Sequence, residues 1–189
     1  MMSKVSSKKN KEMQYVQASI GKRGFAYVLD WYLGSAFTAI PVGLLWNIGT
    51  GETTINTDIS LFEKPYGLLA AFLGFLFGIL YFYVVPAFVW EGQTIGKKLM
   101  KIRIVGENGR TLTKDKLAVR QIIGISFLES AFMLTGNYIT QIISIYINEY
   151  VGMAVNYLML FLFIGTVVLT LKKSKSIHDF LAHSMVIEN

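Results

Sequence analysis

Four runs without a charged residue constrain this 189-residue chain more than any other feature. They cover residues 31–51, 65–90, 130–148 and 150–171. Each reaches the roughly 20 residues that one helical crossing of a bilayer needs. The composition agrees, because 53% of the residues are hydrophobic and 16% are charged, whereas about 25% of a typical soluble domain is charged. The sequence predicts an all-α integral membrane protein and argues against a soluble enzyme.

The basic residues are sorted to one side of these runs. Seventeen of the 18 Lys and Arg precede the first run, separate the second from the third, or follow the fourth. Under the positive-inside rule, we expect both termini to be cytoplasmic and the protein to lie in the cell (plasma) membrane. The net charge of +6 then fits a membrane surface and no nucleic acid. The four expected transmembrane helices are residues 24–48, 66–90, 119–147 and 150–171, after a flexible basic tail at 1–19.

Nothing in the sequence predicts an enzyme, a cofactor or a metal. Cysteine is absent, and His178 and His183 lack a third ligand for a zinc site. The segment 92–98 superficially resembles a phosphate-binding loop. Its two glycines are separated by three residues instead of four, and Lys97 is followed by Lys instead of Ser or Thr. The segment therefore lacks the spacing and the hydroxyl residue with which such a loop binds phosphate and Mg²⁺. We expect no catalytic residues.

Asp30 is the only charged residue inside the first expected helix. Asp30, Gly34 and Thr38 recur at intervals of four and so share one helix face. A carboxylate inside the membrane costs at least about 2.5 kcal/mol on insertion scales, so it should face the bundle with a partner or be protonated. Two readings stay open: a structural aspartate paired with a cytoplasmic Arg or Lys, and a functional one.

The third expected helix carries a polar stripe. Most polar residues between Ser126 and Asn148 fall within about 120° of one another around a helix, and Glu129 is among them. With Asp30 and Asn156, Glu129 forms a candidate path for an ion or proton. The alternative is that these groups only make interhelical hydrogen bonds that fix the packing. Gly136-Asn137 is a candidate break in this helix.

Small residues mark one face of the second expected helix. Ala70, Gly74 and Gly78 recur at four-residue spacing, which lets another helix approach closely. The partner is either another helix of this chain, which we favour, or a second copy.

Two local patterns stand outside the apolar runs. Lys101–Val105 alternates polar and apolar residues, Asn108-Gly109 is a turn signal, and Thr111–Thr113 could return the strand, so we expect a small cytoplasmic β-hairpin. Ser176–Asp179 matches a capping box, which opens a short helix or turn.

Three segments together resemble the RDD family of prokaryotic multi-pass membrane proteins, which is named for an arginine and two aspartates. Residues 22–31 are similar to the family's opening helix and supply Arg23 and Asp30. Residues 92–105 resemble its central G-x-T-x-G-K segment and the strand that follows. Residues 176–182 resemble its closing segment with the second aspartate, Asp179.

The resemblance implies a small helical membrane bundle over residues 20–189. It also implies an activity in transport, with cation/proton exchange for some members. In this picture Arg23 and Asp179 form an ion pair that gates or locks the bundle. The chain departs from the family at His183-Ser184, where members usually carry Gly-Thr.

Two functional hypotheses follow. The first is a small transporter, working as a homo-oligomer, that moves a cation or proton through Asp30, Glu129 and Asn156. The second is a non-catalytic membrane scaffold or accessory subunit whose cytoplasmic loop recruits a partner protein. Both place the chain in contact with the lipid bilayer.

Overall fold

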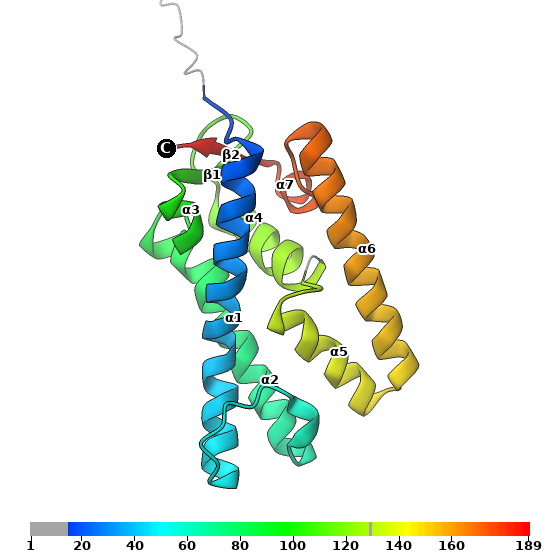
Figure 1. The fold of residues 1–189 in the computed structure, drawn as a ribbon. Helices are drawn as coiled ribbons and strands as arrows, with labels where there is room; N and C mark the ends of the chain where they lie inside the picture. The colour runs from blue at the N-terminus through cyan, green and yellow to red at the C-terminus, as the bar shows by residue number, and fades with distance from the viewer. Residues whose placement is uncertain (1–14, 129) are drawn as a thin grey trace, which may run out of the picture.

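Three long helices dominate the computed structural model, which describes residues 15–128 and 130–189 (Figure 1). Each is long and apolar enough to cross a membrane. They are α1 (Ile20–Thr50), the continuous helix of α2 (Lys64–Ile79) and the π-helical η2 (Leu80–Val89), and α6 (Glu149–Lys173). A single 3-10 turn, η1 (Ile59–Leu61), lies between α1 and α2. The chain is a membrane protein with transmembrane helices.

The third expected span is not one helix. After the short helix α4 (Lys114–Ala118), the π-helical η3 (Val119–Leu128) and the helix α5 (Leu134–Tyr146) are separated by a turn. In this turn the Met133 N–H donates to the Ser130 carbonyl at 2.8 Å, and a Cβ at Gly136 would collide with that carbonyl. The break therefore precedes Gly136-Asn137, and a count of four spans is not confirmed.

The small sheet is not the expected hairpin. Strand β1 (Ile102–Gly106) pairs antiparallel with β2 (Ser184–Glu188) at the end of the chain, with Ile104 opposite Val186. The turn at Asn108-Gly109 does form, because Gly109 adopts a φ of 73° and its N–H donates to the Gly106 carbonyl. The returning segment makes only an isolated bridge at Thr111 before α4 begins, so β1 is left free to pair with β2.

The sheet also holds the start of α1. Residues 16–18, which the sequence assigns to the tail, run beside β2: the Ala18 N–H donates to the Val186 carbonyl, and the Glu188 N–H to the Val16 carbonyl. Residues 1–14 of that predicted tail lie outside the described residues. The remaining short elements, α3 (Ile95–Leu99) and α7 (Ile177–Leu181), lie at the same end of the molecule as the sheet (Figure 1).

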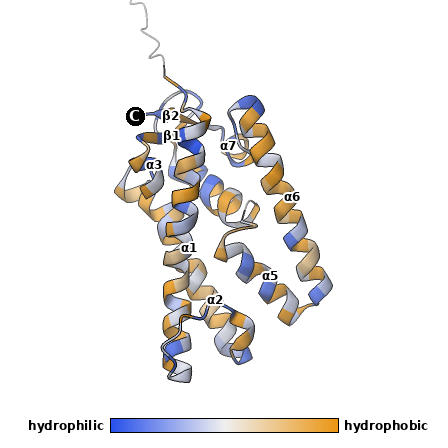
Figure 2. Ribbon diagram, in the orientation of Figure 1, coloured by the Kyte–Doolittle hydropathy of each residue, from blue (hydrophilic) through white to orange (hydrophobic). Residues whose placement is uncertain are grey.

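Packing inside the bundle leaves much apolar surface outside. Helix α1 packs along α2, and α5 packs along α6. The long helices consist mostly of hydrophobic residues, while hydrophilic ones gather toward the sheet end and the helix ends (Figure 2). Many large hydrophobic side chains of the long helices are exposed, among them Leu44, Phe72 and Phe161. Only 11% of the most apolar stretch of α6 is buried, so most of this helix faces outward. Such an outer surface suits lipid, which is as apolar as a protein core.

Candidate functional site

Asp30 lies at the centre of a first cluster of polar groups, which we call the Asp30 centre. Its carboxylate accepts hydrogen bonds from the Tyr81 hydroxyl of η2 at 2.7 Å and from the Thr94 hydroxyl at 2.5 Å. The Gly96 N–H donates to it at 2.8 Å, and the Lys97 ammonium lies 3.2 Å away. Asp30 is 2% exposed, so these four donors replace the water that a carboxylate needs. Lys97 is the partner that the structural reading of Asp30 required.

The two glycines of the central motif let the loop close around Asp30. Gly92 has a φ of 70°, and a Cβ there would collide with the Ile104 carbonyl of β1. A Cβ on Gly96 would stand 2.5 Å from the Ala26 carbonyl and 2.8 Å from an Asp30 oxygen. The motif that fails as a phosphate loop is therefore built to hold a carboxylate of the same chain.

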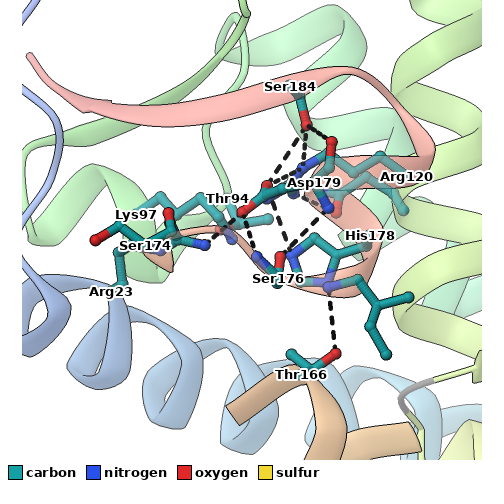
Figure 3. Close-up of polar contacts among 12 residues, drawn as sticks. Arg23, Thr94, Lys97, Arg120, Thr166, Ser174, Ser176, His178, Asp179 and Ser184 are labelled. Carbon is teal, nitrogen blue, oxygen red and sulfur yellow. Dashed lines mark hydrogen bonds and ion pairs between the residues drawn. The ribbon is translucent and has the colours of Figure 1, made fainter. Parts of the chain in front are cut away.

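Asp179 forms a second buried cluster, the Asp179 centre (Figure 3). Its two carboxylate oxygens each meet a guanidinium group, from Arg23 of α1 at 2.5 Å and from Arg120 of η3 at 2.7 Å. The predicted capping box is confirmed, since Ser176 and Asp179 exchange side-chain and backbone hydrogen bonds at the start of α7. Ser184 of β2 also contacts the carboxylate. Asp179 is fully buried, and it joins α1, η3, α7 and β2.

The two arginines make further bonds that fix their positions. Arg23 also donates to the Ser174 carbonyl at the end of α6. Arg120 is 1% exposed and also donates to the Gln121 side chain and the Ser184 hydroxyl, each at 3.2 Å. A charge pair out of water needs such additional hydrogen bonds to be stable.

The electrostatics of the two centres differ. Burial alone would raise the pKa of Asp179, but the charges of Arg120, His178 and Arg23 and the Ser176 N–H outweigh it and hold that pKa well below its usual range. For Lys97 burial is the largest cause and lowers the pKa; the Asp30 carboxylate opposes it. The charge at Asp179 is therefore fixed, whereas the charge at Lys97 is held less firmly.

A cavity of about 200 Å³ lies beside both centres, between α1 and α6. Its polar wall carries the cationic side chains Arg23, Lys97 and Arg120, together with His178. Its other walls are mostly apolar, apart from Thr166, Thr170 and Ser176; they come from the first two turns of α1, the last turns of α6, η3 and the sheet. The volume far exceeds the roughly 10–15 Å³ that seats one water molecule.

The face of α2 with small residues packs inside the chain. A Cβ on Gly78 would stand 2.9 Å from Thr135 and 3.2 Å from the Thr38 hydroxyl, and one on Gly74 would stand 2.6 Å from the Tyr138 ring. The two glycines thus bring α2 against α1 and α5. The hydroxyls of Thr135 and Tyr138 are buried there with no hydrogen-bond partner among the described residues.

Of the other predicted path residues, Asn156 does not join the Asp30 centre. Asn156 is exposed on the surface of α6, whereas Asp30 is buried. Glu129 lies outside the described residues, so its place in a path stays a prediction. Among the residues that are described, no three His, Cys, Asp or Glu side chains group closely enough to hold a metal ion.

Sequence reasoning missed Lys97, Thr94 and Arg120 as members of these centres. Thr94 and Lys97 could have been identified, because both are polar residues of the central motif and Asp30 lacked a partner. Arg120 carries a weaker signal: it is the last charge before eight uncharged residues, a place where a basic side chain enters an apolar helix.

These features define the class: a small multi-spanning helical membrane protein whose buried carboxylates are held by basic residues at one end of the bundle. The sequence model of the RDD family matches residues 17–183, and the chain belongs to that family. Arg23, Asp30 and Asp179, which the resemblance singled out, all lie within the matched residues. A comparison with curated proteins finds no match, and neither does a comparison with solved structures.

Proposed function

We propose that this protein moves a proton or a small cation across the membrane and that the Asp30–Lys97 ion pair is the exchanging group. The observation that carries the proposal is the composition of the Asp30 centre. Asp30 lies ten residues into α1, about 15 Å along the helix, and its cationic partner is a lysine. Unlike arginine, a buried lysine can lose its proton under accessible conditions.

The exchange conserves charge. When Lys97 releases a proton, its neutral amine leaves the Asp30 carboxylate without a counter-charge in a buried site. A cation that binds the carboxylate restores neutrality, and its departure lets Lys97 take up a proton again. The Thr94 and Tyr81 hydroxyls, which donate to Asp30, can turn their oxygen lone pairs toward the cation.

A polar continuation through the bundle supports the same proposal. Thr38, Thr135 and Tyr138 gather against the glycine face of α2, and two of their hydroxyls have no partner in the described part of the chain. Buried polar groups of this kind are normally satisfied by water. We propose that a hydrated path passes these hydroxyls toward the end of the bundle away from the sheet.

The orientation and the fourth crossing are part of this proposal. Thirteen of the 14 Lys and Arg among the described residues, all except Lys64, belong to segments on the sheet side of the long helices, so we place both termini and the sheet in the cytoplasm of a cell (plasma) membrane. We further propose that η3 and α5 cross as one discontinuous helix. A break in the membrane is tolerated where it is buried in protein, and Ser130, Met133 and Thr135 are all buried.

Flux in proteoliposomes tests the proposal. The purified protein is reconstituted with a pH-sensitive dye inside, and Na⁺, K⁺, Li⁺ or Ca²⁺ is added outside at several pH values. We expect at least one cation to drive proton movement, and Asp30→Asn to abolish it. Asp58→Asn, which changes an exposed loop carboxylate, is the matched control and should keep native flux. Native flux in Asp30→Asn would overturn the proposal.

The second candidate, an accessory subunit, is favoured by one observation. Helix α6 turns most of its apolar surface outward, so a transmembrane helix of a partner protein or of a second copy could pack there. Cross-linking in native membranes through a photoreactive residue at Asn156, which is exposed on this surface, tests this. A discrete protein adduct supports a subunit role, and adducts with lipid alone contradict it.

A further inference from the structure

We propose that the cavity between α1 and α6 binds an anionic phospholipid of the cytoplasmic leaflet, with the phosphate beside Arg23 and Lys97 and the upper part of one acyl chain along the apolar walls. The proposal concerns a binding site on the side of the bundle and does not depend on transport. It rests on the position of the cavity, its lining and its balance of charge.

The cavity lies at the depth of the lipid headgroups. On α1 its walls run from Ile20 to Tyr27, the first two turns of the helix, and on α6 from Phe163 to Leu171, just before the helix ends at Lys173. Helix ends rich in lysine mark the membrane surface, and the turns beneath them meet the start of the acyl chains. A ligand here would span that boundary as a phospholipid does.

The gap opens toward lipid because α1 and α6 barely touch. The helices of the bundle pack in the pairs α1 with α2 and α5 with α6. Across the cavity, besides the hydrogen bond from Arg23 to the Ser174 carbonyl at the end of α6, a pair of rings meets, Tyr27 and Phe163, whose centroids lie 5.8 Å apart. Gly24, which also lines the cavity, has no atom within 4 Å of the place where a Cβ would stand. The open space at Gly24 is where an acyl chain would enter.

The balance of charge selects an anion. Three permanently or normally cationic side chains line the cavity, Arg23, Lys97 and Arg120. Two carboxylates, Asp30 and Asp179, pair with them, which leaves one positive charge in excess among these five groups. An uncompensated cation out of water is costly, and a phosphate removes that cost. Basic pockets between helices on the cytoplasmic side are typical sites for acidic lipid headgroups.

The hydrogen-bonding capacity points the same way. Arg23 has five N–H donors, and two of them are used within the described part of the chain, toward Asp179 and the Ser174 carbonyl. Lys97 has three, and two are used, toward Asp30 and Thr94. The remaining donors can serve phosphate oxygens without breaking either carboxylate centre.

Two glycines of α1 offer a matched pair of variants. Gly24→Leu fills the cavity from the α1 side, whereas Gly21 does not line the cavity, and both positions have open space where a Cβ would stand. The full-length protein is reconstituted in vesicles of equal parts phosphatidylglycerol and phosphatidylcholine, extracted in mild detergent, and weighed with its retained lipid by native mass spectrometry.

We expect the native protein and Gly21→Leu to retain phosphatidylglycerol in preference to phosphatidylcholine, and Gly24→Leu to retain about tenfold less. Equal retention in Gly24→Leu and Gly21→Leu overturns the proposal, as does equal retention of the two lipids by the native protein. Displacement of the lipid by millimolar inorganic phosphate also overturns it, because the site would then take a free anion.

A second pair on α6 keeps the test decisive if Gly24→Leu fails to fold. Val167 lines the cavity and Val168 does not, and the two are similarly exposed, at 40% and 42%. Val167→Trp should reduce lipid retention while Val168→Trp leaves it unchanged. The thermal unfolding temperature of each variant reports folding, and cation flux measured on the same samples separates a failure of lipid binding from a failure of transport.

Discussion

The two buried carboxylates of this protein are satisfied in different ways. Asp179 meets two guanidinium groups that cannot lose their protons. Asp30 meets one lysine, two hydroxyls and a backbone N–H. The first arrangement holds its charge at any accessible pH, and the second contains a group that can titrate. We infer that the Asp179 centre locks the fold and that the Asp30 centre can change state.

The largest effect on stability is expected at the Asp179 centre. Asp179→Asn leaves Arg23 and Arg120 in a buried site without a counter-charge, and losing one partner of a buried pair costs about 3–5 kcal/mol. Thermal unfolding in detergent and protein abundance in membranes should both fall sharply. Glu107→Gln, which breaks the exposed pair with Lys175, should leave both nearly unchanged. A native unfolding temperature in Asp179→Asn would contradict the inference that the Asp179 centre stabilises the fold.

Replacing each of the two arginines of the Asp179 centre with lysine should change the stability by different amounts. Arg120 is the more deeply buried, with its side chain 1% exposed against 9% for Arg23, and it reaches Asp179 through two nitrogens. Hydrogen bonds to charged groups contribute about 1.5–3 kcal/mol, so Arg120→Lys should lower the free energy of unfolding by roughly that amount. Arg23→Lys should lower it by less. Chemical denaturation compares the two, and the reverse order would contradict the geometry.

The pH dependence of stability should report the other centre. Because the folded pKa of Lys97 is lowered from 10.5, the unfolded chain binds more protons between the two values, and stability rises with pH across that window. At Asp179 the lowered pKa acts at the acidic end, where stability is lost as pH falls. Lys97→Met should flatten the alkaline rise, and Lys98→Met, a change at an exposed neighbour, should not.

The smallest expected effect concerns the turn that brings β2 back to Asp179. His183 adopts a φ of 49°, a left-handed conformation that costs a residue with a Cβ about 1–2 kcal/mol. His183→Gly should therefore raise the free energy of unfolding by about 1 kcal/mol. His183→Ala retains the Cβ and should give no such gain, so an equal gain from both would remove backbone strain as the cause.

The sequence predicted local features well. The four-residue spacing identified the buried face of α1, on which Asp30, Gly34 and Thr38 all lie. The capping box at Ser176 formed as expected. Both features depend on residues within one or two turns of each other, which is the range over which spacing fixes geometry.

Long-range pairings could not be read from spacing. Thr111–Thr113 alternates polar and apolar residues and follows the turn directly, whereas residues 184–188, the actual partner of β1, carry three consecutive apolar residues and lie far along the chain. The break before α5 depends on Ser130 folding against Gly136, a contact between atoms and not a property of composition. The sequence identified the two parts of the Asp30 centre separately, the unpartnered aspartate and the motif containing Lys97, but it did not predict that they contact each other.

Replacing Lys97 with arginine tests most directly whether the Asp30 centre exchanges a proton. Arginine keeps the positive charge beside Asp30 and has the neighbouring cavity to accommodate its larger side chain, but it does not give up its proton. We predict that Lys97→Arg unfolds near the native temperature and has no cation-dependent proton flux in proteoliposomes. Native flux from a folded Lys97→Arg protein would contradict the account.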